Sequence, residues 1–172
     1  MNKVFLGLGS NVGNKEENLL TAIDLLQNGG TIEKKSSIYD TKPYGYADQD
    51  NFLNIVVEFN TEMDPNDLLI FLQGIEKRLG KKIEFKNGPR TIDIDILFFN
   101  NEIINNKNLE IPHNDIEKKA FVLIPLNEIA PELTHPKLNK NIEELTSNVE
   151  GKEDVRKYWR YWGRIWINQK NN

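Results

Sequence analysis

The chain has 172 residues, of which 38% are hydrophobic and 28% charged, and its net charge is −4. This length suits one domain with a real hydrophobic core, and no apolar run approaches the ~20 residues of a membrane helix. Cysteine is absent, which excludes disulfides, thiolate metal sites and cysteine nucleophiles and makes a cytoplasmic location the default expectation. The negative charge argues against general nucleic-acid binding. Neither nucleic acid nor a membrane is expected as a partner.

The first half of the chain alternates between predicted strands and helices. Residues 4–8 form a short apolar strand, and a helix follows whose N-cap is Asn14. Residues 31–39 are predicted as a strand with one solvated face. Residues 42–51 are predicted as a loop because they are rich in Gly, Pro, Asp and Asn.

The second half continues the same alternation. Residues 52–59 are the clearest strand, and a helix follows that is capped by Asp64 and stopped by Gly80. Residues 92–98 are the next strand, with Ile92, Ile94, Ile96 and Phe98 alternating along it. The order β-α-β-β-α-β predicts an α+β, ferredoxin-like core: an antiparallel sheet with both helices on one face, the other face being free to form a site.

Beyond residue 100 the sequence is less regular. We expect a domain over residues 1–140 and a C-terminal extension over residues 141–172 that includes some helix and packs on the same domain. The extension ends in the aromatic and basic stretch RKYWRYWGRIW. Its aromatic side chains either pack on the domain or contact a partner.

The stretch PRTIDIDILFF places two aspartates inside a predicted strand, where Asp is depleted. Asp93 and Asp95 are two residues apart, so both carboxylates project from one face, roughly 6.5 Å apart along the chain. One interpretation is a Mg²⁺ site, because this ion prefers carboxylate oxygens together with substrate phosphates, and two carboxylates can bridge two ions. The alternative is a solvated strand face, or one aspartate paired to Arg90 or a lysine.

A basic segment lies directly before this strand. Residues 76–90 carry six basic side chains against two acidic ones, in a chain that is negative overall. Cations beside a carboxylate pair are what a nucleoside triphosphate requires, since they contact its non-bridging oxygens. A solvated, mobile loop remains the alternative.

Three other features of the sequence bear on its function. The stretch GLGSNVG does not have the dinucleotide-binding spacing, and its glycines are interpreted as allowing tight turns and close packing. Asn54 shares a strand face with Phe52, so the pair either binds a flat heterocycle or lies at a sheet edge. His113 follows Pro112 and is a packing or site residue, whereas His135 is expected to be structural.

The motifs GLGSNVGNKEENL, SSIYDTKPYG, DNFLN, QGIEKRLG, GPRTIDIDIL, IPH and FVLIPLNEIAP occur in this order along the chain. Together they resemble the 6-hydroxymethyl-7,8-dihydropterin pyrophosphokinase family of folate biosynthesis. The resemblance covers residues 3–136, and GPRTIDIDIL followed by IPH is its most specific part. It implies transfer of the β,γ-pyrophosphoryl group of ATP to the pterin hydroxymethyl oxygen with release of AMP.

The resemblance also implies a role for each matching residue. Asp93 and Asp95 match the pair that holds two Mg²⁺ ions, and Arg90 and Lys81 match catalytic positions near the transferred phosphates. The positions that match the pterin pocket are Thr41, Pro43, Tyr44, Gly45, Phe52, Asn54 and Phe121. The positions that match the ATP site are Gln73, Glu76, Lys81, Arg90, Ile96, Leu109, His113 and Lys119. The expected partners are ATP and the pterin, and the expected state is a monomer.

The sequence departs from the family pattern at several positions. Relatives commonly carry Gly-Arg-x-Arg after the second helix, where this chain reads Gly80-Lys81-Lys82-Ile83. Lysine does not form the bidentate fork that arginine forms with phosphate, so the departure bears on catalytic rate. Lys119 also replaces an arginine, Asn114 stands where an aromatic residue can flank adenine, and the aromatic tail does not match.

Two other functions fit parts of this pattern. An RNA-recognition domain has the same element order and stacks bases on sheet aromatics, but Asp93 and Asp95 would face the RNA phosphates. The second alternative is a catalytically weak relative that binds ATP or pterin as a regulatory module. Only the altered Lys81–Ile83 stretch supports this alternative.

Overall fold

The computed structural model describes residues 1–81 and 85–158. The strands are β1 (Asn2–Ser10), β2 (Thr31–Lys35), β3 (Tyr39–Thr41), β4 (Phe52–Thr61), β5 (Asp93–Phe99), β6 (Ile104–Asn105), β7 (Glu110–Ile111), β8 (Thr134–His135), β9 (Lys140–Asn141) and β10 (Val155–Lys157). The α-helices are α1 (Lys15–Leu26), α2 (Pro65–Arg78), α3 (Ala120–Ile129) and α4 (Ile142–Asn148). Short 3₁₀ turns cover Ile116–Lys118 and Lys152–Asp154.

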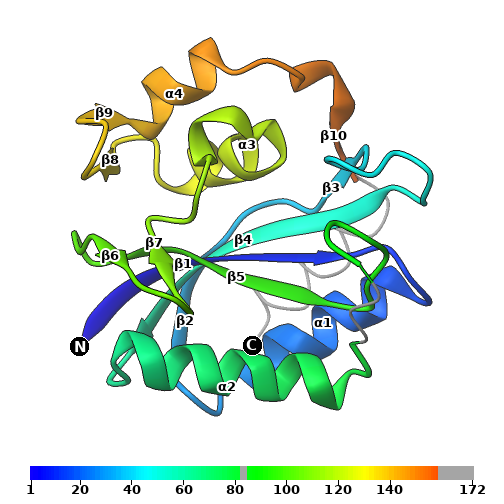
Figure 1. Ribbon diagram of the computed structural model, residues 1–172, viewed down its shortest axis with the longest axis horizontal. Helices are drawn as coiled ribbons and strands as arrows, with labels where there is room; N and C mark the ends of the chain where they lie inside the picture. Colours follow the sequence, from blue (N-terminus) through cyan, green and yellow to red (C-terminus); the bar gives the residue numbers. More distant parts are fainter. Residues whose placement is uncertain (82–84, 159–172) are drawn as a thin grey trace, which may run out of the picture.

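One antiparallel sheet organises the molecule (Figure 1). Its strands lie in the order β10-β3-β4-β1-β5, and β2 also pairs with β4. Since β2 and β3 together occupy the place of the second predicted strand, the β-α-β-β-α-β order and the α+β class are confirmed. The two short hairpins β6-β7 and β8-β9 lie outside this sheet.

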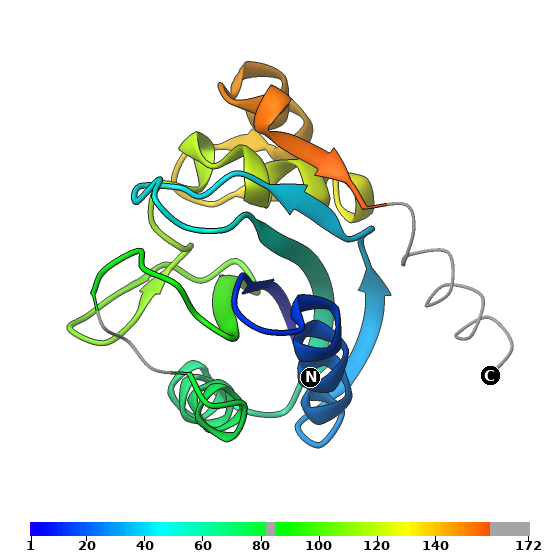
Figure 2. The ribbon, with the colours of Figure 1, turned by 90° about the vertical axis from the view of Figure 1, so that its right-hand side faces the viewer.

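Helices α1 and α2 cover one face of the sheet (Figures 1 and 2). Asn14 caps α1 by accepting a hydrogen bond from the Glu17 N–H, and Asp64 caps α2, where Pro65 is the first residue. Gly80 ends the second helical segment with a φ of 78°, which suits glycine. Apolar side chains of both helices pack on those of β1, β4 and β5 to form the larger core.

The opposite face is not entirely free, which corrects the prediction. Helices α3 and α4 cover part of it and bury a second core against β1, β4 and β5. A bulge in the pairing of β1 with β5 places Leu97 and Phe98 in this second core, whereas Ile96 belongs to the first. The predicted alternation therefore holds through Ile96 and is wrong for Phe98, because the extra residue reverses the side-chain alternation.

The strand predicted over residues 31–39 is interrupted at Ser36. Its backbone N–H donates to the Val56 carbonyl, and its hydroxyl accepts from the Val56 N–H at 2.9 Å. A buried side chain thus replaces a backbone carbonyl at this point of the ladder, and the chain separates into β2 and β3 while both remain paired to β4.

The extension was predicted to include some helix and to pack on the domain. Helix α4 packs on α3, and β10 pairs with β3. Tyr158 packs on the larger core, and its hydroxyl contacts the Glu16 carboxylate. The remainder of the predicted aromatic tail, residues 159–172, lies outside the described residues. Within residues 1–81 and 85–158, no helix has the length and hydropathy that crossing a membrane demands.

Candidate active site

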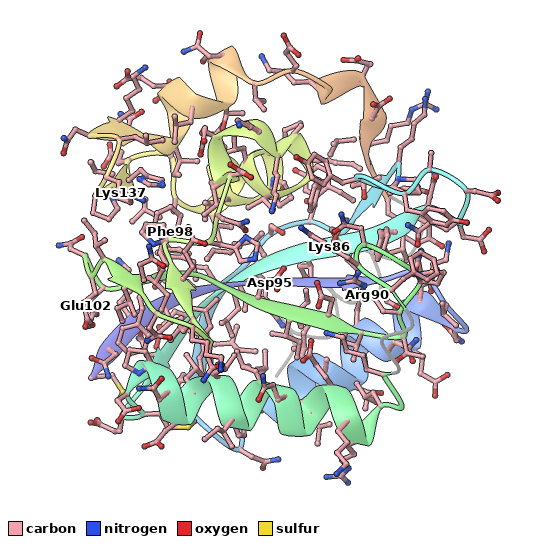
Figure 3. All side chains as sticks on the ribbon, in the orientation of Figure 1. Lys86, Arg90, Asp95, Phe98, Glu102 and Lys137 are labelled. Carbon is pink, nitrogen blue, oxygen red and sulfur yellow. The ribbon has the colours of Figure 1, made fainter. Side chains whose placement is uncertain are left out.

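A cavity of about 440 Å³ lies on the face of the sheet that α3 and α4 leave uncovered. Strands β1, β4 and β5 form its floor, and its walls come from residues 41–44, 86–90 and 113–122. Figure 3 shows Asp95 near the middle of the sheet, with Lys86 and Arg90 towards one end and Phe98 towards the other. The predicted carboxylate pair and most of the predicted pterin residues therefore share one space.

Glycines of β1 leave room above the two aspartates. Gly9 is opposite Asp93 and Gly7 is opposite Asp95 in the β1-β5 ladder, and all four residues line the cavity. Because glycine has no side chain, neither carboxylate has a cross-strand side chain directly beside it in β1. The interpretation that the glycines allow close packing agrees with this arrangement.

Asp93 is paired with two cations. Its Oδ1 accepts from Lys81 Nζ at 2.8 Å, and its Oδ2 lies 3.2 Å from Arg90 Nη1. Burial alone would raise the pKa of Asp93, but the charges of Lys81 and Arg90 outweigh it, so the pKa is lowered. The alternative that one aspartate pairs with Arg90 or a lysine is therefore correct for Asp93, which pairs with both.

Lys81 bridges Asp93 and Glu76. Its ammonium lies 2.7 Å from Glu76 Oε2, and that same oxygen accepts the Ile94 N–H at 2.9 Å. Glu76 is buried, and burial raises the pKa of its carboxyl despite these donors. The Lys81 side chain is only 12% exposed, so the bridge is not a solvated surface ion pair.

Asp95 differs from its neighbour. Within the described part of the chain no group donates a hydrogen bond to its side chain, and the titratable side chain beside it is that of His113, whose Nε2 lies 3.7 Å from Oδ1. Enclosure by the cavity walls, followed by repulsion from Asp93, raises the pKa of Asp95 well above its usual value. One carboxylate of the pair is neutralised, and the other has no lysine or arginine within ion-pair distance among residues 1–81 and 85–158.

His113 and Lys119 stand beside Asp95. His113 Nδ1 lies 3.5 Å from Lys119 Nζ, and both side chains line the cavity. Burial and then the Lys119 charge lower the pKa of His113 to about 4, so its imidazole is neutral at pH 7. His113 therefore faces the site, but it brings no positive charge there.

The opposite part of the cavity holds Asn54 and Thr41. Asn54 Nδ2 donates to Thr41 Oγ1 at 2.7 Å, and a Cβ at Gly9 would come within 2.5 Å of Asn54 Oδ1. Strand β4 lies between β1 and β3, so the alternative that Asn54 lies at a sheet edge is wrong. A flat ligand ring that lies over Gly9 would contact the Asn54 amide, whose orientation is fixed by its hydrogen bond to Thr41.

Aromatic side chains enclose this part of the cavity. Phe52 comes from the floor and Phe121 from α3, and both line the cavity. Tyr44 packs on Phe121 with 5.6 Å between ring centroids, and Lys119 Nζ lies 5.6 Å from the centre of the Tyr44 ring. This part of the site offers aromatic faces to a planar ligand.

Several predicted residues lie away from the cavity lining. Ile96 and Leu109 belong to the core on the other face of the sheet, and Gln73 is exposed on α2. Pro43 and Gly45 belong to the loop that forms one wall without lining the cavity themselves, and Glu76 and Lys81 reach it only through Asp93.

Other lining residues were not predicted. Those that lie outside the helices and strands are Lys42, Asn87, Asn114 and Asp115. Lys86 also lines the cavity and belongs to the basic segment predicted over residues 76–90. Asn114 was noted only as a departure from the family pattern. Surface lysines and asparagines are common in loops, so their types carried no signal. Asn87 has a φ of 61°, which fits its position in a tight turn.

The donor groups at Asp93 and Asp95 fit hard cations. Two carboxylates face one cavity, and one of them has no close lysine or arginine among the residues that the structure describes. In the described part of the chain no cluster of three or more His, Asp or Glu side chains could hold a metal ion alone. A bound Mg²⁺ would therefore need further oxygens, which fits an ion held by carboxylates together with substrate phosphates.

A comparison with protein families decides the assignment. Residues 5–131 match the sequence profile of 7,8-dihydro-6-hydroxymethylpterin-pyrophosphokinase (HPPK). The chain belongs to the HPPK family. The predicted resemblance is confirmed, and the protein is an enzyme of the diphosphokinase class that acts in folate synthesis with ATP as co-substrate. Family membership also removes the RNA-recognition alternative.

Named relatives agree with HPPK membership. The 2-amino-4-hydroxy-6-hydroxymethyldihydropteridine pyrophosphokinase of Aquifex aeolicus is 44% identical over 145 residues, which cover 84% of this chain and 91% of the relative. The enzyme of the same name from Bacillus subtilis is 42% identical over 157 residues, or 90% of this chain and 89% of the relative.

Solved structures show the same HPPK fold. A Plasmodium falciparum HPPK-DHPS variant crystallised with pterin and p-hydroxybenzoate matches 91% of this chain with a TM-score of 0.74 at 21% identity. The chain spans only 46% of that longer protein. At this identity the likeness concerns the fold alone.

Proposed function

We propose that the protein transfers the β,γ-pyrophosphoryl group of ATP to the hydroxymethyl oxygen of 6-hydroxymethyl-7,8-dihydropterin. The observation that carries this proposal is one cavity that joins an aromatic and amide pocket at Phe52, Asn54 and Phe121 to the carboxylate pair Asp93 and Asp95. A planar pterin suits the first part, and a metal-bound triphosphate suits the second.

The reaction balances without a further reactant. The hydroxymethyl oxygen forms a bond to the β-phosphorus, the bond from that phosphorus to the α,β-bridging oxygen breaks, and AMP leaves with that oxygen. The hydroxyl proton is released. Two Mg²⁺ ions held by Asp93 and Asp95 would neutralise the phosphate oxygens and lower the pKa of the hydroxyl.

The residues of the chain contribute mainly position and charge. Asn54 and Thr41 would orient the pterin edge, while Phe52 and Phe121 would hold its faces. Arg90 pairs with Asp93, and its guanidinium would also contact the transferred phosphates when ATP is bound. His113 is neutral at pH 7, so it would bind phosphate oxygen as a neutral donor. Fixed groups of this kind supply most of the acceleration in phosphoryl transfer.

Product analysis tests the proposal. Purified protein, ATP, Mg²⁺ and the pterin are mixed, and the nucleotides are separated. We expect AMP that depends on the pterin and is lost with EDTA. ADP would mean single-phosphoryl transfer and would contradict the proposal. ATP binding that needs Mg²⁺ but yields no product would support the alternative of a regulatory binding protein.

We also propose that the protein acts as a monomer in the cytoplasm. The absence of cysteine supports the cytoplasmic location. Light scattering at working concentration tests the monomer, and a stable dimer would overturn it.

A further inference from the structure

Two loops that form walls of the cavity are joined by the hydrogen-bonded side-chain amides of Asn11 and Gln49. The first, residues 42–51, is called the pterin loop, and the second, residues 85–91, the arginine loop. Both contribute cavity-lining residues, namely Lys42 and Tyr44 from the first and Lys86, Asn87 and Arg90 from the second. Neither amide, Asn11 nor Gln49, lines the cavity.

Asn11 ties both loops to the end of β1. Its backbone N–H donates to the Arg90 carbonyl at 3.1 Å, and its side-chain Oδ1 accepts the Arg90 N–H at 2.9 Å. Its Nδ2 donates to Gln49 Oε1 at 2.8 Å and to the Asp50 carbonyl at 3.0 Å. Asn11 is 2% exposed, and both of its amide hydrogens are used.

Gln49 continues the network across the gap between the loops. Its Nε2 donates to the carbonyls of Tyr46 and Asn87, both at 2.7 Å, while its Oε1 accepts from Asn11. Exchanging oxygen and nitrogen in either amide would set oxygens against carbonyl oxygens. The partners therefore fix the orientation of both side chains.

Two further contacts join the same loops. Tyr46 and Phe85 pack edge to face with 4.9 Å between ring centroids. A Cβ at Gly45 would come within 2.7 Å of Asn87 Nδ2, so glycine allows the pterin loop to approach the arginine loop. Asn11 and Gln49 thus lie at the centre of a contact between loops that come from distant parts of the chain.

We propose that Asn11 and Gln49 are positioning residues that hold the two loops as one unit and so fix Arg90 relative to the bound pterin. This inference rests on the proposed function, since it assigns the pterin and the phosphates to opposite walls. Small displacements of aligned reactants slow a reaction strongly. A buried and fully satisfied amide network is well suited to prevent such displacement.

The main test variant is Gln49→Glu. It keeps the shape and the acceptor for Asn11, but it removes both N–H donors and sets a carboxylate oxygen against the carbonyls of Tyr46 and Asn87. Asn11→Asp is the second variant, because it keeps the acceptor for Arg90 and loses both donors to the pterin loop. Asn18→Asp is the matched control, since Asn18 donates to Ser10 Oγ and the Val12 carbonyl and contacts neither loop.

Hydrogen exchange of the ligand-free protein is the first measurement and does not depend on activity. In both test variants we expect faster amide exchange in residues 42–51 and 85–91 together, and in Asn18→Asp no change in either loop. Exchange that rises in only one loop would overturn the inference even if the enzyme is active. Melting temperatures near that of the control show that the variants are folded.

Steady-state kinetics are the second measurement. For Gln49→Glu we expect kcat to fall about tenfold to a hundredfold and the KM for pterin to rise, while the KM for ATP stays within about twofold. In an Arg90→Ala background the further loss of kcat should shrink to about twofold or less, because Gln49 acts through Arg90.

If Gln49→Glu lowers kcat by the same factor in the Arg90→Ala background as in the wild type, Gln49 does not act through Arg90. That result would mean a merely structural role and would overturn the inference. If the wild-type protein forms no AMP, the proposed function fails, and the exchange measurement still decides whether the loops form one unit.

Discussion

Lys81 acts as an internal counter-ion in the ligand-free site. It contacts both Glu76 and Asp93 at hydrogen-bond distance, at the position where the family pattern would place an arginine. A metal ion approaching Asp93 must therefore compete with an ammonium group that is already bound. At the scale of single residues, this competition and the isolation of Asp95 are the two features with the clearest consequences.

The first prediction concerns Lys81→Met. Removing the competing ammonium should tighten Mn²⁺ binding to the nucleotide-free protein by about fivefold or more, since competition between two ligands is a reciprocal coupling. Calorimetry or the spin signal of Mn²⁺ measures this directly. Lys77→Met is the control, because Lys77 is exposed on α2 and carries the same charge. Equal tightening in both variants would mean a general charge effect.

The second prediction concerns Asp95→Asn. Burial and repulsion from Asp93 raise the pKa of Asp95. The Asp95 carboxyl therefore binds a proton more tightly in the folded protein than in the unfolded chain. The ionised carboxylate therefore lowers the free energy of unfolding at neutral pH. Without metal, Asp95→Asn should raise the melting temperature, though only modestly because the Asp95 side chain is 40% exposed and solvent screens its charge, while AMP formation is lost.

The gain in stability from Asp95→Asn should shrink as the pH falls towards the ordinary aspartate pKa of 3.8 and vanish below it, where Asp95 is protonated in both the folded and the unfolded chain. Glu132→Gln, which removes an exposed negative charge elsewhere, is the control. Retained activity, or a lower melting temperature at neutral pH, would contradict the assignment of Asp95 to a strained metal site.

At the scale of elements, Ser36 explains how one predicted strand becomes two. Its hydroxyl accepts the Val56 N–H, and it is completely buried. Hydrophobic alternation predicts where a strand lies, but it does not reveal a side chain that enters the ladder. The same limit applies to the bulge at Leu97, because one inserted residue reverses a face without changing the composition.

The third prediction concerns Ser36→Ala. The change leaves the buried Val56 N–H without an acceptor, so the free energy of unfolding should fall by about 1–3 kcal/mol. Urea denaturation measures this loss. Ser147→Ala is the control, since the Ser147 hydroxyl contacts the Glu143 carbonyl on the exposed side of α4, and it should change stability by less than about 0.5 kcal/mol. A loss no greater than in the control would contradict this role.

For the whole molecule, the helices and strands that carry periodic patterns were predictable from the sequence. The contacts that these elements and loops make with one another were not. Capping residues and apolar spacing predicted α1 and α2, and the Asp93–Asp95 pair was predictable from its conflict with a buried strand. The coverage of the second face by α3 was not predicted, because Pro125 within that helix obscures the pattern. Asn11 and Gln49 were missed because a buried amide network depends on loop packing, which has no local signal.

The fourth prediction concerns pH and stability. Both histidines of the chain have lowered pKa values, His113 to about 4 and His135 mainly through burial. At these two histidines the unfolded chain therefore binds more protons below pH ~6.5, and their contribution to the free energy of unfolding should fall as the pH drops from about 6.5 towards 4, against the opposite contribution of Asp95. Denaturation series at several pH values measure this loss.

His135→Asn should reduce this pH dependence. His135 Nδ1 accepts the N–H groups of Lys137 and Leu138, and an asparagine oxygen can accept in its place without being protonated. The slope of stability against pH should become smaller without a large loss at pH 7. An unchanged slope would show that the imidazole of His135 titrates normally in the folded chain.

Gly9, the cross-strand partner of Asn54 in β1, has a consequence for inhibitors and resistance. Any side chain at Gly9 would collide with Asn54 Oδ1, which in turn would disturb the bond from Asn54 to Thr41. A compound that presses against the backbone of Gly9 would touch a position where escape mutations damage the proposed pterin pocket itself. Compounds that depend on the exposed ring of Tyr44 instead contact a loop position where substitutions disturb no strand. Drug candidates anchored on the floor should therefore retain potency against evolving targets longer than those anchored on the walls.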